Sequence, residues 1–156
     1  MSGVTHAPLP RQSVMRLFAL LAAAATVLVL AVPSMGSSRP TVGAHGSTYG
    51  KILFDGRGFV LYAFTRDAGG RSTCSGACAK AWPPYLVHAR PGAAAGASAG
   101  LLGTIRRADG TRQATYAGRP LYYYVGDRKA GQILCQNVTE FGGKWLVVRP
   151  SGKLVR

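Results

Sequence analysis

Carboxylates are scarce in this 156-residue sequence, in which five acidic residues stand against 19 lysines and arginines. Histidine is also scarce, and His6, His45 and His88 are scattered along the chain. Neither a His-Glu-x-x-His motif nor a glycine-rich phosphate-binding loop occurs. "GASAG" around Ser98 matches a nucleophile motif, but it lies in an Ala/Gly-rich loop without the strand and helix that such a motif needs. The sequence therefore contains no convincing catalytic machinery, and an enzymatic role is the weaker expectation.

A long hydrophobic run is lacking as well. Leu17–Val32 has 16 residues, or roughly 24 Å as a helix, which is short for a bilayer core of about 30 Å. The length suits the apolar part of a signal peptide that is cut after Gly36. We therefore expect residues 1–36 to be a signal peptide or an uncleaved N-terminal anchor, which engages the membrane during export. The protein is then exported across the cytoplasmic membrane. No cysteine lies near the cut, so no lipobox is expected.

The exported part keeps 17 basic and five acidic residues, a net charge of +12. Such an excess favours an anionic partner, such as an acidic cell-envelope polymer or a lipid surface. The simpler interpretation is a solvated surface on a secreted protein. The basic residues are dispersed, with no run longer than two, and no specific binding of nucleic acid is expected.

Glycine turns between short apolar segments predict a mainly β fold. The polar, glycine-rich residues 37–46 are expected to be a flexible linker. Beyond them, "DGRG", Asp109-Gly110 and Pro150-Ser151-Gly152 each separate two apolar runs, as in β-hairpins. The Ala/Gly-rich residues 90–100 are expected to form an exposed, mobile loop. We therefore predict one small antiparallel β domain over residues 47–156, with at most one or two short helical turns.

One phrase occurs twice in this domain, as "LYAFTRD" at Leu61–Asp67 and "LYYYVGD" at Leu121–Asp127. Gly-Arg precedes both, glycine follows both, and a tryptophan closes each half. These correspondences predict two diverged, hairpin-containing repeats, about residues 47–88 and 101–156. A single repeat is too small to bury both of its faces, so the two are expected to pack as one pseudo-symmetric domain.

The repeated phrase has two interpretations. It places six candidate residues at matching positions: Tyr62, Phe64, Asp67, Tyr122, Tyr124 and Asp127. In the structural interpretation, which we favour, the aromatic side chains fill the core. Each aspartate then accepts hydrogen bonds in the following turn or from a buried tyrosine. In the alternative, the aromatic side chains stack on a ligand that the aspartates bind, or the two carboxylates are catalytic.

Cysteine is limited to three residues. Outside the cytoplasm the pair in "CSGAC", Cys74 and Cys78, predicts a disulfide, for which Gly76 permits the distorted turn. Two alternatives stay open: a redox dithiol, although the spacing is not Cys-x-x-Cys, and a metal pair, for which His88 is the only nearby imidazole. Cys135 is left over, either free or paired with another cysteine. No metal site or cofactor is predicted.

The order of these features resembles a known family. "LYAFTRD", "STCSGACAKAWPP", "YAGRPLYYYVGD" and "GGKWLVV" together resemble the secreted repeat of unknown function of bacterial lipoproteins, over about residues 47–150. The resemblance implies the same fold and compartment, and it makes the six tyrosine, phenylalanine and aspartate positions the family motif. It implies no chemistry. The chain departs from the family in lacking the lipobox cysteine and in having Cys135 where a glycine-rich turn is expected.

The sequence as a whole predicts an exported, non-enzymatic binding or interaction module of the cell envelope or extracellular space, with a basic surface. The alternative is an extracellular redox or metal-binding protein that uses Cys74 and Cys78. A weaker alternative is an enzyme that acts on an extracellular polymer.

Overall fold

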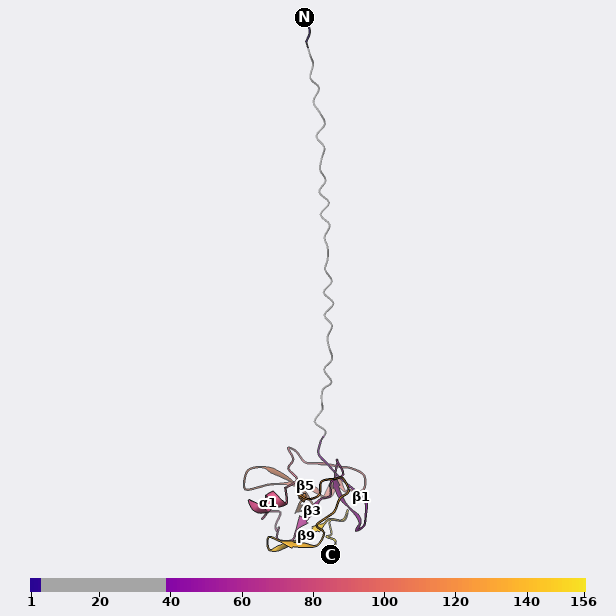
Figure 1. Cartoon of the computed structure of the whole chain (residues 1–156), viewed down its shortest axis with the longest axis vertical. Helices are drawn as coiled ribbons and strands as arrows, with labels where there is room; N and C mark the ends of the chain where they lie inside the picture. The colour runs from indigo at the N-terminus through magenta and orange to yellow at the C-terminus, as the bar shows by residue number, and fades with distance from the viewer. Residues whose placement is uncertain (4–38) are drawn as a thin grey trace. The chain divides into compact units, whose positions relative to one another are not determined.

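The computed structural model describes residues 1–3 and 39–156. The expected signal peptide or anchor, residues 1–36, lies outside the described residues apart from its first three. Within the described part of the chain, no helix has the length and apolarity needed to cross a bilayer. Figure 1 shows the domain that residues 39–156 form.

Short strands dominate this domain, which confirms the predicted mainly β fold. In chain order the elements are β1 (Thr41–Ser47), β2 (Gly50–Asp55), β3 (Tyr62–Phe64), helix α1 (Ala77–Ala81), β4 (Gly92–Ala93), the 3-10 turn η1 (Ala99–Leu101), β5 (Leu102–Arg106), β6 (Arg112–Tyr116), β7 (Arg119–Pro120), β8 (Val138–Glu140) and β9 (Gly143–Val147). They form three small sheets, in the strand orders β2–β1–β4, β3–β9–β8 and β5–β6–β7. All strand pairs are antiparallel except β1 with β4.

β1 corrects the expectation of a flexible linker over residues 37–46. Val42–Ser47 of β1 pairs with the whole of β2. The small side chains that suggested a linker allow a further segment to approach closely, because a Cβ at Gly43 would lie 3.2 Å from the Cβ of Ala94. Val42 is fully buried, and Ala94 N–H donates to its carbonyl at 2.8 Å. Part of the Ala/Gly-rich loop, although mostly exposed, is thus held against β1.

All three expected hairpins form, but only one of them joins paired strands, and the other two close through a single β-bridge each. β5 and β6 turn at Asp109-Gly110, where Gly110 has a φ of 82°, a conformation that favours glycine. Residues 148–154 form the C-terminal hairpin. Around "DGRG" the two apolar runs form a single β-bridge, between Phe54 and Val60. The hairpin stays short because β2 takes β1 as its main partner and β3 takes β9.

Tyr62 and Tyr122 lie where the two repeats meet. They face each other in an antiparallel bridge and exchange both backbone hydrogen bonds, at 2.9 Å each. Each repeat also pairs its tyrosine strand with the tryptophan segment of the other repeat. β3 pairs with residues 145–147 of β9, which lies beside it in Figure 1, and residues 123–125 bond to residues 81–83. This crossed pairing joins the two copies into one domain.

The side chains of the two phrases alternate between two buried clusters, as the strand periodicity predicts. The first cluster contains both tryptophans together with Tyr62, Phe64 and Tyr122. The second lies on the opposite face and contains Leu61, Ala63 and Leu121. Matching positions of the two repeats therefore enter the same cluster.

Candidate functional site

The six candidate motif residues lie in the core or against it. Four are buried, with exposed fractions of 7% or less: Tyr62, Phe64, Tyr122 and Asp127. Asp67 and Tyr124 are partly exposed. This burial favours the structural interpretation of the motif over a ligand-binding face, because the two fully buried tyrosines present no ring face to solvent.

The first tyrosine of each motif donates a hydrogen bond to the aspartate of the other repeat. Tyr62 Oη donates to Asp127 Oδ2 at 2.7 Å, and Tyr122 Oη donates to Asp67 Oδ2 at 2.6 Å. The two bonds are related by the same pseudo-twofold arrangement as the backbone bridge between the tyrosines. Aspartate was a predicted partner for a buried tyrosine, but the strand pattern does not indicate that the partners are exchanged between the repeats.

Burial and these carboxylates change the acid–base behaviour of the paired groups. Burial, followed by the hydrogen bond to Asp127, raises the pKa of Tyr62 far above its ordinary value. Burial and the hydrogen bond to Asp67 do the same for the pKa of Tyr122. Burial also raises the pKa of Asp127, against the lowering effect of the hydrogen bonds from Tyr62 and Leu134. Both tyrosines therefore keep the proton that they donate.

Four aromatic rings form a stack beside the paired tyrosines. Trp82 and Trp145 lie parallel, with centroids 4.0 Å apart and an interplanar angle of 3°. Phe64 stacks on Trp145 at 4.2 Å, and Tyr124 lies against Trp82 at 4.7 Å. Trp82 Nε1 donates to Glu140 at 2.8 Å, whereas Trp145 Nε1 is buried without a partner. The second aromatic residue of each motif, Phe64 or Tyr124, thus packs on the tryptophan of the other repeat.

The exchanged bond between Tyr62 and Asp127 predicts energetic coupling across the repeats. Tyr62→Phe and Asp127→Ala each remove one partner of a buried hydrogen bond, so the second change costs little once the first is made. We expect the double variant to lose about 1–3 kcal/mol less free energy of unfolding than the sum of the single losses. Urea unfolding of the full chain, followed by circular dichroism, measures the four free energies.

The matched control combines Tyr62→Phe with Asp67→Ala. Asp67 belongs to the same repeat as Tyr62, but its side chain accepts from Tyr122. These two losses should add to within about 0.5 kcal/mol, as for side chains that do not interact. Equal coupling in the two cycles would contradict the exchange of partners.

Cys74 and Cys78 form the predicted disulfide, and both are buried. Gly76 has a φ of 53° at the start of α1, which gives the distorted turn that the pairing requires. With both sulfur atoms in the disulfide, neither is a thiolate available as a nucleophile or a metal ligand. Across residues 1–3 and 39–156, no three side chains gather that together could hold a metal ion.

Cys135 is the counterpart of Cys74 in the second repeat. Thr73 and Leu134, which precede the two cysteines, each donate their N–H to Oδ1 of the motif aspartate of their own repeat, at 2.7 and 2.9 Å. Cys135 is free and partly buried, and burial raises its pKa. The Cys135 thiol therefore occupies the position in the second repeat that Cys74, one of the two disulfide-bonded cysteines, occupies in the first.

A buried cation lies at one corner of the domain, next to the β5–β6 turn. Arg107 is 9% exposed. Its Nη1 donates to Ser72 Oγ and Gln113 Oε1, and its Nη2 donates to Cys74 O, each at 2.7 Å. Its Nε is buried without a hydrogen-bond partner, and Asp109 Oδ2 lies 3.6 Å from it. Nothing in the sequence distinguishes Arg107 from the other dispersed arginines, so its burial was not predictable.

Arg107 lines a surface hollow of about 390 Å³. The other lining residues are Arg71, Ser72, Arg106 and Ala108. Arg71 and Arg106 are exposed, and in the described part of the chain neither guanidinium makes a hydrogen bond or an ion pair. The hollow therefore combines two free cations with one that the fold holds in place.

A second hollow, of about 490 Å³, has its polar groups already engaged. Arg39, Arg57, Tyr85 and Tyr123 are among the residues that line it. The hydroxyls of Tyr85 and Tyr123 donate to a backbone carbonyl and to Asp55, at 3.1 and 3.0 Å. Arg57 is paired with the same Asp55 at 2.9 Å, and Arg39 donates to a backbone carbonyl at 3.0 Å. This hollow is the weaker candidate for a binding site.

Comparison with known proteins adds one match. A family model described as a secreted repeat of unknown function matches residues 45–85 and 103–149, one copy in each half of the domain. No curated protein and no solved structure matches the chain. The two matched copies carry the exchanged tyrosines and aspartates and both tryptophans.

Proposed function

The chain belongs to the family of secreted repeats of unknown function, and on that premise we propose that it is an exported, non-enzymatic binding module for an anionic polymer of the cell envelope. The family's description as secreted supports export. The observation that supports the proposed binding is a difference between the charged side chains. The acidic ones accept hydrogen bonds within the domain, whereas most of the basic ones are exposed to solvent.

All five acidic side chains accept hydrogen bonds from other groups of the domain. Each of the five accepts a hydrogen bond: Asp55 from Arg57 and Phe59, Asp67 from Tyr122, Asp109 from Thr111, Asp127 from Tyr62, and Glu140 from Trp82. Carboxylates therefore serve the fold, and few of their oxygens remain to neutralise cations. Between residues 39 and 156 the ion pairs are Arg57 with Asp55 and Arg107 with Asp109.

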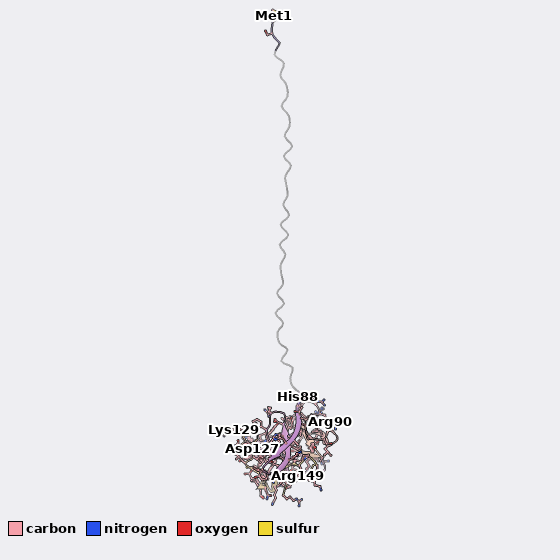
Figure 2. The ribbon with its side chains drawn as sticks, turned by 90° about the vertical axis from the view of Figure 1, so that its right-hand side faces the viewer. Met1, His88, Arg90, Asp127, Lys129 and Arg149 are labelled. Carbon is pink, nitrogen blue, oxygen red and sulfur yellow. A yellow bond between two sulfur atoms is a disulfide. The ribbon has the colours of Figure 1, made fainter. Side chains whose placement is uncertain are left out.

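The basic side chains, in contrast, point into solvent. Fifteen of the 17 are exposed. Arg90, Lys129 and Arg149 lie at well-separated points around the outline of the domain (Figure 2). A flat membrane would contact one side of such a domain, whereas a flexible polyanion can follow cations over several sides. This dispersion supports a polymer as the partner in preference to a lipid surface.

The other two hypotheses have less support. A metal-binding role would need free Cys74 and Cys78 thiolates, and a redox role would need a disulfide that a partner thiol can reach, whereas both sulfur atoms lie in a buried disulfide. An enzyme that uses Asp67 and Asp127 would need carboxylates free to act on a substrate, and each accepts both a tyrosine hydroxyl and a backbone N–H.

Salt-dependent retention tests the proposed binding. The full chain is passed over an immobilised poly(glycerol phosphate) polymer in about 20 mM and about 500 mM salt, across which screening shortens the Debye length several-fold. We expect retention at low salt and release at high salt, because dispersed cations attract the polymer over long range.

Two control arms accompany this experiment. A neutral polysaccharide matrix measures retention that does not depend on charge, and vesicles containing phosphatidylglycerol measure binding to an anionic surface. Binding to the vesicles that survives high salt reports on the apolar Leu17–Val32 segment rather than on the basic side chains. Absence of retention at low salt, or retention that salt does not change, would refute the proposal.

A further inference from the structure

The two repeats give the domain two structurally equivalent corners, and only one of them is charged. Leu53 and Ala114 occupy equivalent positions in the two repeats. The carbonyl of each accepts a hydrogen bond from the N–H of the leucine that begins a motif phrase, and the N–H of each donates to the closing segment of the other repeat. The residues before them, Ile52 and Gln113, are therefore equivalent too. Both are fully buried, but one is apolar and the other carries an amide.

Two further differences accompany this one. Ser72, just before Thr73, corresponds to Ile133, just before Leu134, by the matched bonds to the motif aspartates. Arg107, two residues beyond the strand partner of Gln113, corresponds to Ser47, two residues beyond the strand partner of Ile52. The first corner is thus built from Ile52 and Ile133, which pack in and against one apolar cluster. The second corner replaces both isoleucines with polar residues and adds a guanidinium.

The fold itself does not require this charge. Burying a guanidinium costs desolvation free energy, which its three hydrogen bonds repay only in part, and apolar side chains of similar volume are commonly as stable or more so. The equivalent corner of the same domain closes without a buried basic side chain. The side chain of Arg107 nevertheless lines the hollow that Arg71 and Arg106 also line, and its Nε is buried beside Asp109 without a hydrogen-bond partner.

We infer that this corner is a binding site for a phosphate-type oxyanion, with Arg107 as its fixed cation and Arg71 and Arg106 as the two arms that close on the ligand. Planar guanidinium groups offer paired donors that match the oxygens of such a group. Ser72 and Gln113 hold Arg107 in place at 2.7 Å. The inference rests on the proposed function, because a phosphate of the envelope polymer is the ligand that the site would take.

The site is also connected to the duplicated motif. Ser72 Oγ, which accepts from Arg107, lies 2.7 Å from the hydroxyl oxygen of Tyr122. Tyr122 in turn donates to Asp67 at 2.6 Å. Arg107 is therefore connected through Ser72 to the Tyr122–Asp67 pair. A hydrogen-bonded pair that occurs in both repeats thus helps to orient a guanidinium that occurs at only one corner.

Asp109 is the charged group that opposes a ligand there. Its Oδ1 accepts from Thr111 N and Oγ1, at 2.9 and 2.6 Å, and its Oδ2 is the atom 3.6 Å from Arg107 Nε. An incoming phosphate competes with this carboxylate and meets its repulsion. Asp109→Asn should therefore strengthen phosphate binding several-fold, which a purely structural role of the corner would not predict.

Titration of the full chain with inorganic phosphate, followed by the backbone amide resonances of Ser72 and Ala108, tests the site. Chloride at the same ionic strength is the reference. We expect a saturable shift with phosphate, and binding weaker by roughly tenfold or more in Arg71→Ala/Arg106→Ala, since each lost charge-assisted contact costs about one decade. Arg128→Ala/Lys129→Ala removes the same charge elsewhere and should leave the titration within about twofold of the wild type.

The outcomes separate the site from the proposed function. A non-saturating response to phosphate, or equal weakening in the two double variants, means an adventitious ion only and overturns the site, whether or not the polymer is retained. A saturable response that Arg71→Ala/Arg106→Ala abolishes supports the site, even if the polymer is not retained and the proposed function fails.

A third variant tests whether the charge serves binding or folding. Ser72→Ile, Arg107→Ser and Gln113→Ile together copy the apolar corner into the charged one. We expect the urea midpoint of this variant to stay at or above that of the wild type, while the phosphate response is lost. A variant that unfolds or keeps its phosphate response would overturn the assignment of Arg107 as the fixed cation.

Discussion

Trp145→Ala is expected to remove about 3–5 kcal/mol of the free energy of unfolding, a large part of the roughly 5–15 kcal/mol available to a domain of this kind. Trp145 is fully buried. Its ring stacks on Trp82 and Phe64 and meets Tyr122 edge-on, with centroids 5.1 Å apart. The deletion therefore leaves a cavity that both repeats line. Urea unfolding followed by far-ultraviolet circular dichroism measures the loss.

A pair of phenylalanine variants provides the control. Trp145→Phe keeps a ring in the stack and removes an Nε1 donor that has no partner, whereas Trp82→Phe removes an Nε1 that donates to Glu140. Trp145→Phe should thus cost roughly 1 kcal/mol less than Trp82→Phe, the usual worth of one hydrogen bond. If Trp145→Ala costs less than Trp145→Phe, the stack does not stabilise the domain.

Raising the pH from about 10 to about 11 is expected to remove about 4 kcal/mol of stability, because four buried or partly buried tyrosines resist ionisation. Burial is the main cause in each case. It raises the pKa of Tyr85 to about 12, and the pKa values of Tyr62, Tyr122 and Tyr123 are raised further. In the unfolded chain these phenols lose their protons near pH 10, while the folded domain retains them. The stabilisation is therefore complete below about pH 10 and is lost as the pH rises toward the folded values.

Urea unfolding at several alkaline pH values, together with tyrosinate absorbance, measures this transition. The absorbance change of these four residues should coincide with unfolding instead of preceding it. Tyr62→Phe removes one of the four phenols, so the decline over the same interval should shrink by about 1 kcal/mol. Complete ionisation of the tyrosines in a domain that stays folded would contradict the burial of their hydroxyls.

The strand faces were predictable from the sequence because they depend on local geometry. Alternation in "LYAFTRD" assigns Leu61 and Tyr62 to opposite faces whatever strand lies alongside, and Asp109-Gly110 marks its hairpin by the conformations that those residues tolerate. Pairing partners are not local. Nothing in the sequence pattern predicts that β3 pairs with the tryptophan strand of the other repeat. The pairing of β1 was not predicted because its small residues, which allow close approach, are also typical of a linker.

The candidate site divides in the same way. The motif residues could be found from the repetition, and their structural interpretation follows from apolar area and the need to satisfy a buried hydroxyl. The exchange of Asp67 and Asp127 as hydrogen-bond partners between the repeats could not be predicted. Two matching phrases are equally compatible with tyrosine–aspartate bonds inside each repeat. Arg107 could not be found either, since its burial depends on where Ser72 and Gln113 lie after folding. The sequence contains one indication of the difference between the corners. The matching triplets "STC" and "ILC" begin with Ser72 at the charged corner and with Ile133 at the apolar corner.

The exchanged pairs have a consequence for how such a protein could be divided. Each repeat holds the carboxylate that the other repeat's tyrosine requires and the tryptophan segment that its strand requires. A chain with one copy would meet these needs only by association with a second molecule, at a cost that depends on protein concentration. Joining the copies in one chain replaces that concentration with the effective concentration set by the connecting segment, which is in the millimolar range for short flexible connections. The duplication therefore makes folding independent of protein concentration, a useful property for an exported protein.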